Sequence, residues 1–188
     1  MSKDQFYLIA LGANLPSAEG PPEVTLRSAL EALAKAGARE VVASRLFATP
    51  CFPAGAGPDY VNAAARLCFD GGAEAFLALL HRIEAAFGRE REQRWGQRVL
   101  DLDLIAAGDD VLPDEAGYRA WLDLPLEEQK RRAPDRLILP HPRLQDRPFV
   151  LVPLAEVAPE WRHPVRGRTV REMAEALPGA ARDEVVPL

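Results

Sequence analysis

The sequence predicts an α+β fold: a ferredoxin-like (split βαβ) antiparallel sheet with two helices on one face, a C-terminal extension and a surface insertion near residues 113–134. Two observations predict it. Short apolar runs with the two-residue period of strands are separated by longer runs of helical period, and their order is strand, helix, strand, strand, helix, strand. At 188 residues with 48% hydrophobic residues, the chain suffices for one core, so we expect a single domain over residues 1–188.

The first half of the chain carries three of the predicted strands. The apolar run at residues 6–11 predicts a buried strand that ends in a turn. Leucines and alanines recur at helical spacing over residues 26–34, and Gly37 is a typical helix stop. Residues 40–47 predict the second strand. Residues 60–69 predict the third, because alternate residues there are apolar.

The second half completes the unit and extends it. Residues 76–87 are apolar at i, i+3, i+4 and i+7, which predicts the second helix, closed by Gly88. The fourth strand is expected at residues 99–106. The charged stretch at residues 113–134 has no place in the unit, so we interpret it as a helical insertion packed on the surface. A capping-box spacing predicts a last helix over residues 169–177.

Composition narrows the class of protein. The net charge of −5 argues against general affinity for nucleic acid or an anionic membrane, because both require a broad basic field. Neither a signal peptide nor an apolar run of about 20 residues is recognisable, so we expect a cytoplasmic protein with no membrane partner. Cys51 and Cys68 lack any metal-binding spacing and are expected to be reduced thiols.

The stretch "RWGQRVLDLDLI", residues 94–105, sets two carboxylates into an apolar strand. Residues i and i+2 of a strand share a face, so Asp101 and Asp103 point to one side and the leucines beside them to the other. The leucines are expected in the helix-covered core and the carboxylates on the open face. Mg²⁺ commonly uses one or two carboxylates together with substrate phosphates. Taken alone, a pair of this kind is more often explained by ion pairs to arginines or by an exposed sheet face.

Basic side chains cluster on both sides of these carboxylates in the sequence. They are Arg89, Arg91, Arg94 and Arg98 before the pair, and Arg136, His141, Arg143 and Arg147 after it. Carboxylates for Mg²⁺ and guanidinium groups for phosphate oxygens are the groups that phosphoryl transfer requires. The sequence has no GxxxxGK[ST] loop, so a nucleotide would be held by side chains.

Five motifs, in order, resemble those of the 6-hydroxymethyl-7,8-dihydropterin pyrophosphokinase family of folate biosynthesis. "RWGQRVLDLDLI" resembles its R-W-G-P-R-x-L-D-[LV]-D-[IL] signature. The other four are "ALGANL", "TPCFPAGAGPDYVNAAA", "IEAAFGRER" and "LPHPRLQDRPFVLVPLAEVAP". The resemblance runs from about Phe6 to Pro159, and it agrees with the ferredoxin-like element order read from the residues.

The resemblance implies transfer of pyrophosphate from ATP to the hydroxymethyl oxygen of 6-hydroxymethyl-7,8-dihydropterin, with AMP leaving. ATP and the pterin would be the partners of the chain, and a monomer is expected. Asp101 and Asp103 would hold two Mg²⁺ ions. Arg89 and Arg98 would balance charge on the transferred group, which makes the implied catalytic set Arg89, Arg98, Asp101 and Asp103.

The resemblance also implies two binding sets. The ATP-binding set is Glu84, Arg91, Trp95, Arg98, Leu104, Arg136, Ile138, His141 and Arg147. The pterin-binding set is Thr49, Pro50, Phe52, Tyr60, Asn62, Trp95 and Phe149. Tyr60 and Phe149 would stack on the two faces of the ring, and Asn62 would bond to its amide-like edge. Without the motifs, these two aromatic residues read as ordinary core residues.

Two departures and two rival functions stay open. Gln97 replaces the usual proline of the signature, and Ile138 replaces a residue that often carries a hydroxyl. One rival is a non-catalytic nucleotide- or pterin-binding module of the same fold. The other is a different metal-dependent transferase, acting on nucleotides or nucleotide sugars, that uses the same pair of aspartates. The insertion at residues 113–134 either covers the nucleotide or decorates an edge.

Overall fold

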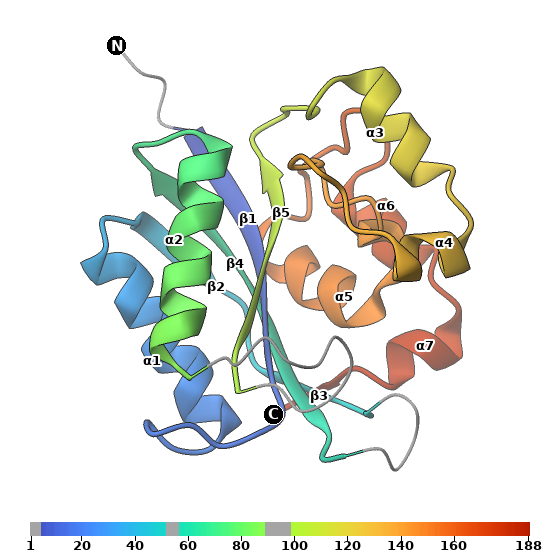
Figure 1. The fold of residues 1–188 in the computed structure, drawn as a ribbon. Coiled ribbons are helices and arrows are strands. Elements are labelled where there is room, and N and C mark those ends of the chain that lie inside the picture. Colours follow the sequence, from blue (N-terminus) through green and yellow to red (C-terminus); the bar gives the residue numbers. More distant parts are fainter. Residues whose placement is uncertain (1–4, 52–56, 89–98) are drawn as a thin grey trace.

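The computed structural model describes residues 5–51, 57–88 and 99–188 (Figure 1). In chain order the elements are β1 (Gln5–Ala13), α1 (Pro22–Lys35), β2 (Arg39–Ala43), β3 (Phe47–Thr49), β4 (Tyr60–Phe69), α2 (Ala73–Ala86), β5 (Asp101–Ala107), α3 (Glu115–Leu122), α4 (Leu126–Arg131), the 3-10 helix η1 (Leu144–Asp146), α5 (Pro148–Val157), α6 (Val170–Glu175), α7 (Gly179–Asp183) and β6 (Val186–Pro187).

One antiparallel sheet forms the centre of the molecule. Its strand order is β5-β1-β4-β3-β6, and β2 also pairs with β4. The long central strand β1 pairs with β4 on one side and with β5 on the other, both antiparallel. The predicted antiparallel sheet of an α+β fold is therefore confirmed, and β5, which carries the two aspartates, is an edge strand.

The predicted strand at residues 40–47 is wrong as a single element. The structure divides it into β2 and β3, which both pair with β4. Glu40 has a positive φ of 51°, and the pairing of β2 with β4 shifts register between Arg39 and Val42. At the break, Ser44 still pairs with Ala64 of β4: its backbone N donates to Ala64 O at 2.9 Å, and its Oγ accepts from Ala64 N at 3.0 Å.

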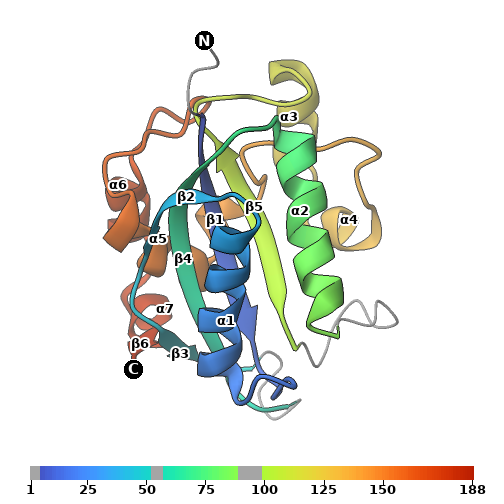
Figure 2. The same cartoon turned by 90° about the vertical axis from the view of Figure 1, so that its left-hand side faces the viewer.

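The helices α1 and α2 cover one face of the sheet, as predicted, and lie in front of it in Figure 2. The core on this side combines alternate residues of the strands with the apolar stripes of both helices. Leu100, Leu102 and Leu104 belong to it and are at most 5% exposed. The alternation in "DLDLI" therefore has the predicted effect, since burying each leucine side chain contributes about 2 kcal/mol.

The opposite face is not open as the sequence led us to expect. The helix α5 packs on it and α6 packs against α5, so the molecule has three layers (Figure 1). A second apolar core lies there, in which Leu8 and Ile105 of the sheet are grouped with Leu151 and Leu154 of α5. The expectation was wrong because the second face also carries apolar residues, such as Leu8, Ala64 and Ile105.

The insertion is helical, as predicted, and contains α3 and α4. Tyr118 of α3 is fully buried, and its hydroxyl lies 2.9 Å from Nε2 of His163. The predicted capping box is present, because Thr169 Oγ1 accepts from Glu172 N and the Glu172 carboxylate accepts from Thr169 N. The helix it begins ends at Glu175 and is followed by α7, so it is not the last one.

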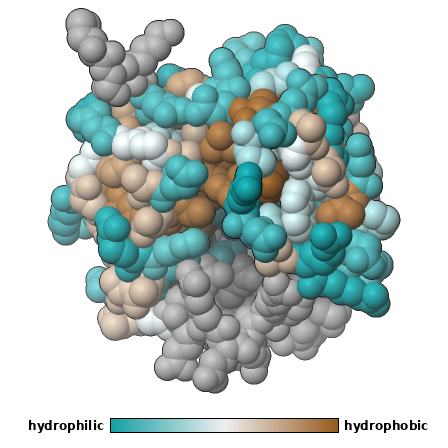
Figure 3. All heavy atoms as spheres, turned by 45° about the horizontal axis from the view of Figure 1, so that its top comes forward, coloured by the Kyte–Doolittle hydropathy of each residue, from teal (hydrophilic) through white to brown (hydrophobic). Residues whose placement is uncertain are grey.

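Within residues 5–51, 57–88 and 99–188, no helix is long and apolar enough to cross a membrane. The face in Figure 3 is largely hydrophilic, with hydrophobic side chains gathered toward its middle.

Candidate active site

The two aspartates of β5 lie on the face that α5 covers. Asp101 is opposite Gly12 of β1, and Gly12 is opposite Asn62 of β4. Residues directly opposite each other in antiparallel strands point to the same face. Asp101, Gly12 and Asn62 therefore form one row across three adjacent strands. Because Gly12 has no side chain, the space between the carboxylate and the amide is left free by the strand that separates them. Asp103 follows on the same face, and both carboxylates are half-buried.

Asp103 is paired with an arginine. Its Oδ2 lies 2.9 Å from Nη1 of Arg147, the residue that precedes the first turn of α5. The two side chains are 34% and 24% exposed, so the pair is reachable by a ligand. Because arginine also binds phosphate oxygens bidentately, Arg147 can serve both the carboxylate and a bound phosphate. Pairing with an arginine and binding a phosphate-bound metal are thus compatible here.

The pair of carboxylates fits Mg²⁺ that arrives with a nucleotide. Mg²⁺ prefers oxygen ligands and keeps water and substrate phosphates in its coordination sphere. Asp101 and Asp103 supply carboxylates from one face of a single strand. Among the described residues, no group of three or more His, Cys, Asp or Glu side chains forms a complete metal site. The remaining ligands would have to come from phosphate and water.

A cavity of about 700 Å³ lies beside Asp103, between α2, β5 and the segment that leads to α5. The structure brings to it every described residue of the predicted ATP-binding set, together with one of the two aspartates: Glu84, Asp103, Leu104, Arg136, Ile138, His141 and Arg147. These residues are up to 63 positions apart in the sequence. Their individual roles toward ATP stay predictions.

Glu84 of α2 is bound to the backbone of β5. It is 1% exposed, and its Oε1 accepts a hydrogen bond from Leu102 N at 2.8 Å. An edge strand has backbone groups that no neighbouring strand satisfies, and a buried N–H needs an acceptor. Glu84 therefore positions the strand that carries both aspartates, in addition to lining the cavity.

His141 contributes a neutral imidazole to the cavity. Its backbone N donates to Ile105 O at 2.8 Å, and its Nδ1 accepts from Arg143 N at 3.1 Å. Because Nδ1 is an acceptor, the proton of the neutral ring is on Nε2. Burial and the neighbouring Arg147 lower the pKa of His141 to about 4. At neutral pH the ring therefore offers an uncharged N–H donor.

Three residues of the predicted pterin set, Thr49, Tyr60 and Asn62, lie at the end of the sheet near Gly12. Asn62 is buried, and its Nδ2 donates to Thr49 Oγ1 at 2.7 Å. Tyr60 is half-buried and two residues before Asn62, so it shares the face of Asn62. Pro50 is exposed. Phe149 is 39% exposed, with the guanidinium carbon of Arg147 at 5.9 Å from its ring centre. Stacking of a pterin between Tyr60 and Phe149 stays a prediction.

Several predicted residues lie outside the described part of the chain. They are Phe52, Arg89, Arg91, Trp95 and Arg98, together with Gln97. Their predicted roles stay predictions.

Sequence reasoning missed several residues that line the cavity. Leu77, His81 and Glu84 are spaced four and three residues apart on α2, so the three side chains share one face of the helix. Helical spacing counted back from Glu84 would have found them. Trp121, Gln129 and Arg132 come from the insertion, and no local pattern indicates that they reach the cavity.

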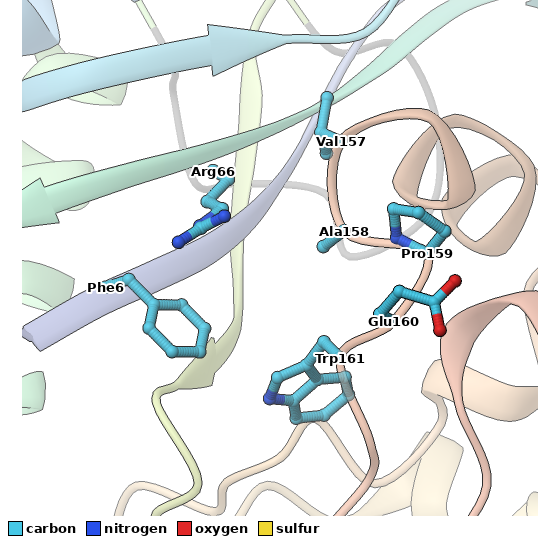
Figure 4. A pocket seen from close by; sticks show the side chains of 7 residues that line it. All are labelled: Phe6, Arg66, Val157, Ala158, Pro159, Glu160 and Trp161. Carbon is cyan, nitrogen blue, oxygen red and sulfur yellow. The ribbon is translucent and has the colours of Figure 1, made fainter.

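A second, smaller hollow of about 300 Å³ lies between β1, β4 and the segment that follows α5 (Figure 4). Its lining residues are Phe6, Arg66, Val157, Ala158, Pro159, Glu160 and Trp161. None of the predicted site residues belongs to it, so we assign it no part in the reaction.

Two histidines, the buried His163 and the partly buried His141, make stability depend on pH. Burial is the main cause that lowers the pKa of His163, like that of His141, to about 4. In the unfolded chain both pKa values return to about 6.5. Between pH 4 and pH 6.5, roughly, the unfolded state therefore binds more protons than the folded state. The free energy of unfolding is therefore expected to fall by about 1–2 kcal/mol per histidine from pH 7.5 to pH 5.

Urea unfolding of the parent and of His163→Asn at both pH values measures this effect. The free energy of unfolding of the variant should differ less between pH 7.5 and pH 5 than that of the parent, whatever its value at either pH. The matched control is His81→Asn, because His81 is exposed on α2. An undiminished pH dependence in His163→Asn would contradict the assignment.

Comparison with known proteins identifies the family. A sequence profile of 7,8-dihydro-6-hydroxymethylpterin-pyrophosphokinase matches residues 8–159. A Synechocystis protein called 2-amino-4-hydroxy-6-hydroxymethyldihydropteridine pyrophosphokinase is 37% identical over 186 residues, covering 96% of this chain and 80% of its own length. A Pseudomonas aeruginosa protein of the same name is 36% identical over 176 residues, covering 93% of both chains.

Solved structures agree in fold. The wild-type HPPK-DHPS protein of Plasmodium falciparum superposes with a TM-score of 0.61 at 14% identity, over 92% of this chain. Our chain spans 44% of that protein. The match of the profile to most of the chain and the identities to curated relatives confirm the predicted resemblance: the chain belongs to the 7,8-dihydro-6-hydroxymethylpterin-pyrophosphokinase family.

Proposed function

We propose that this chain transfers pyrophosphate from ATP to 6-hydroxymethyl-7,8-dihydropterin in folate biosynthesis, giving the pterin diphosphate and AMP. The single observation that carries the proposal is the juxtaposition at β5. Asp103 lines the 700 Å³ cavity, while Asp101 is in one row with Gly12 and Asn62 at the predicted pterin end. A nucleotide in the cavity and a pterin beside Asn62 would meet at the two carboxylates.

In this reaction the hydroxymethyl oxygen attacks the β-phosphorus of ATP and loses its proton. The bond between the β-phosphorus and the oxygen that bridges to the α-phosphate breaks, and AMP leaves with that oxygen. Two Mg²⁺ ions held by Asp101 and Asp103 would supply stabilisation of the phosphate charge. Arg147 binds Asp103 and is close enough to neutralise a phosphate beside it. The predicted partners Arg89 and Arg98 would act on the transferred group.

The chain's own residues orient both substrates. Glu84 holds β5 in place through Leu102 N, so the aspartates are positioned before the nucleotide binds. His141 offers a neutral donor at the nucleotide side. At the other end, the bond from Asn62 to Thr49 fixes the amide that would recognise the pterin edge. Tyr60 and Phe149 would stack on the ring.

Four further expectations belong to this proposal. The unit from β1 to β5 would be of the ferredoxin-like type, which the antiparallel pairing of β1 with both β4 and β5 supports. Residues 1–188 would form one domain, since both apolar cores share one sheet. The protein would act as a monomer and would be found in the cytoplasm.

Product analysis tests the reaction. With Mg-ATP and the reduced pterin, ³¹P NMR is expected to show AMP and the pterin diphosphate in equal amounts. The control is 6-methyl-7,8-dihydropterin, which has no hydroxyl group and should give no AMP. Release of ADP, or no turnover of the nucleotide, would overturn the proposal. Turnover of a nucleotide sugar without any response to pterin would favour the rival transferase.

A further inference from the structure

The insertion reaches the 700 Å³ cavity beside Asp103. Trp121 of α3 and Gln129 of α4 line it together with Arg132, which follows α4. They share this cavity with Asp103 and Arg147. The sequence left open whether the insertion covers the nucleotide or decorates an edge of the sheet. Its side chains form part of the cavity wall, which favours the first alternative.

The structure holds Trp121 in place from three directions. Next to it on α3, Tyr118 is buried and bonds to His163 at 2.9 Å, which anchors the helix to the C-terminal segment. Gln129 Nε2 donates to the backbone oxygens of Trp121 and Leu124, both at 2.9 Å. The guanidinium carbon of Arg132 lies 5.9 Å from the centre of the Trp121 ring. The backbone that carries Trp121 is thus held in place, and Arg132 lies beside the indole.

The chemistry of the lining suits the two ends of a nucleotide. Asp103, Arg147 and Arg143 supply charge for a metal-bound triphosphate. Leu104, Ile138 and the indole supply apolar surface for an uncharged base. A purine is flat and aromatic, and aromatic side chains bind bases by stacking on their faces.

We propose that Trp121 binds the purine base of ATP, so that the insertion contributes a base-binding wall to the nucleotide site. The identification of the ligand as ATP rests on the proposed function. Trp121 would then govern affinity for the nucleotide, while the charged groups govern affinity for the triphosphate. The two contributions can be separated experimentally.

Calorimetric titration with the Mg²⁺ complex of a non-hydrolysable ATP analogue measures the contribution of the base. Trp121→Ala is expected to weaken binding about tenfold, the size of one lost stacking contact. Trp121→Phe should stay within about threefold of the parent because it keeps an aromatic face. Inorganic tripolyphosphate has no base, so its affinity should be equal in all three proteins. The KM for the pterin should not change.

The matched control is Arg119→Ala. Arg119 is exposed on the same helix, pairs with Glu115 at 2.7 Å and does not line the cavity. It should bind both ligands as the parent does. Tryptophan fluorescence is an independent readout that does not require the alanine variant to fold. The analogue should quench the fluorescence of the parent more strongly than that of Trp121→Phe, which lacks the indole.

The outcomes separate the two proposals. Unchanged affinity for the analogue in Trp121→Ala, or equal quenching in the parent and Trp121→Phe, overturns the role of Trp121. If Trp121→Ala binds the analogue and tripolyphosphate more weakly by the same factor, the role of Trp121 is also overturned, because the effect is then structural. If the parent forms no AMP from ATP and pterin, while only the analogue weakens in Trp121→Ala, the proposed function fails and the base-binding wall stands.

Discussion

Asp103→Asn is expected to lower kcat by at least about a thousandfold, equivalent to about 4 kcal/mol in the activation free energy. The amide has the shape of the carboxylate but not its charge, so it cannot balance the metal-bound triphosphate. In the free protein Asp103 pairs with Arg147 in a half-exposed position, so folding should change by less than about 1 kcal/mol. The measurement is AMP formation at saturating Mg-ATP and pterin, with urea unfolding alongside.

A neighbouring carboxylate provides the control for Asp103. Asp109 is exposed in the turn that follows β5 and does not line the cavity, so Asp109→Asn should have the kcat of the parent. Electron paramagnetic resonance measures the binding of Mn²⁺ in the presence of the ATP analogue. This binding should be weaker than in the parent for Asp103→Asn but not for Asp109→Asn. A kcat for Asp103→Asn within tenfold of the parent would show that the carboxylate has only a structural role.

Gly12→Val is expected to raise the KM for the pterin at least about tenfold and to leave the affinity for the ATP analogue unchanged. A Cβ added at Gly12 would lie 3.0 Å from Oδ1 of Asn62. Asn62 cannot easily move away, because it is buried and bonded to Thr49 at 2.7 Å. The added methyl groups of valine would also fill the space between Asn62 and Asp101, where the pterin is proposed to bind. Steady-state kinetics with each substrate varied in turn measures the effect.

The substitution at Gly12 can be graded. Gly12→Ala adds only the Cβ and should have a smaller effect on the same KM. Gly179→Ala serves as the control, since a Cβ there meets nothing within 4 Å. An unchanged pterin KM in Gly12→Val, or a rise confined to the KM for ATP, would place the pterin elsewhere.

Local patterns predicted the elements because each pattern expresses a local cause. The two-residue alternation around Asp101 and Asp103 determined which side chains face the core, since successive residues of a strand point to opposite faces. The capping box at Thr169 determined where α6 begins, because side chain and backbone bond within one turn. The helical spacing of α2 likewise predicted which residues pack on the sheet.

The prediction was wrong where the outcome depended on distant partners. At the break between β2 and β3, the backbone N of Arg45 donates to the Glu156 carboxylate of α5 at 2.9 Å, a partner that residues 40–47 do not reveal by themselves. The second face of the sheet was expected to be open, yet its apolar residues are covered by α5. The alternation identified the inner face but did not show what would cover the outer one.

The sequence by itself determined the family, the antiparallel sheet with its helices, and a set of residues suited to phosphoryl transfer. Only the tertiary structure decided how that set is arranged. It bonds Glu84 to the backbone of β5, pairs Arg147 with Asp103 and brings Trp121 from the insertion into the cavity wall. The physical reason is that these contacts join residues 18 or more positions apart, and periodicity carries information only about neighbours within a strand or a few helical turns.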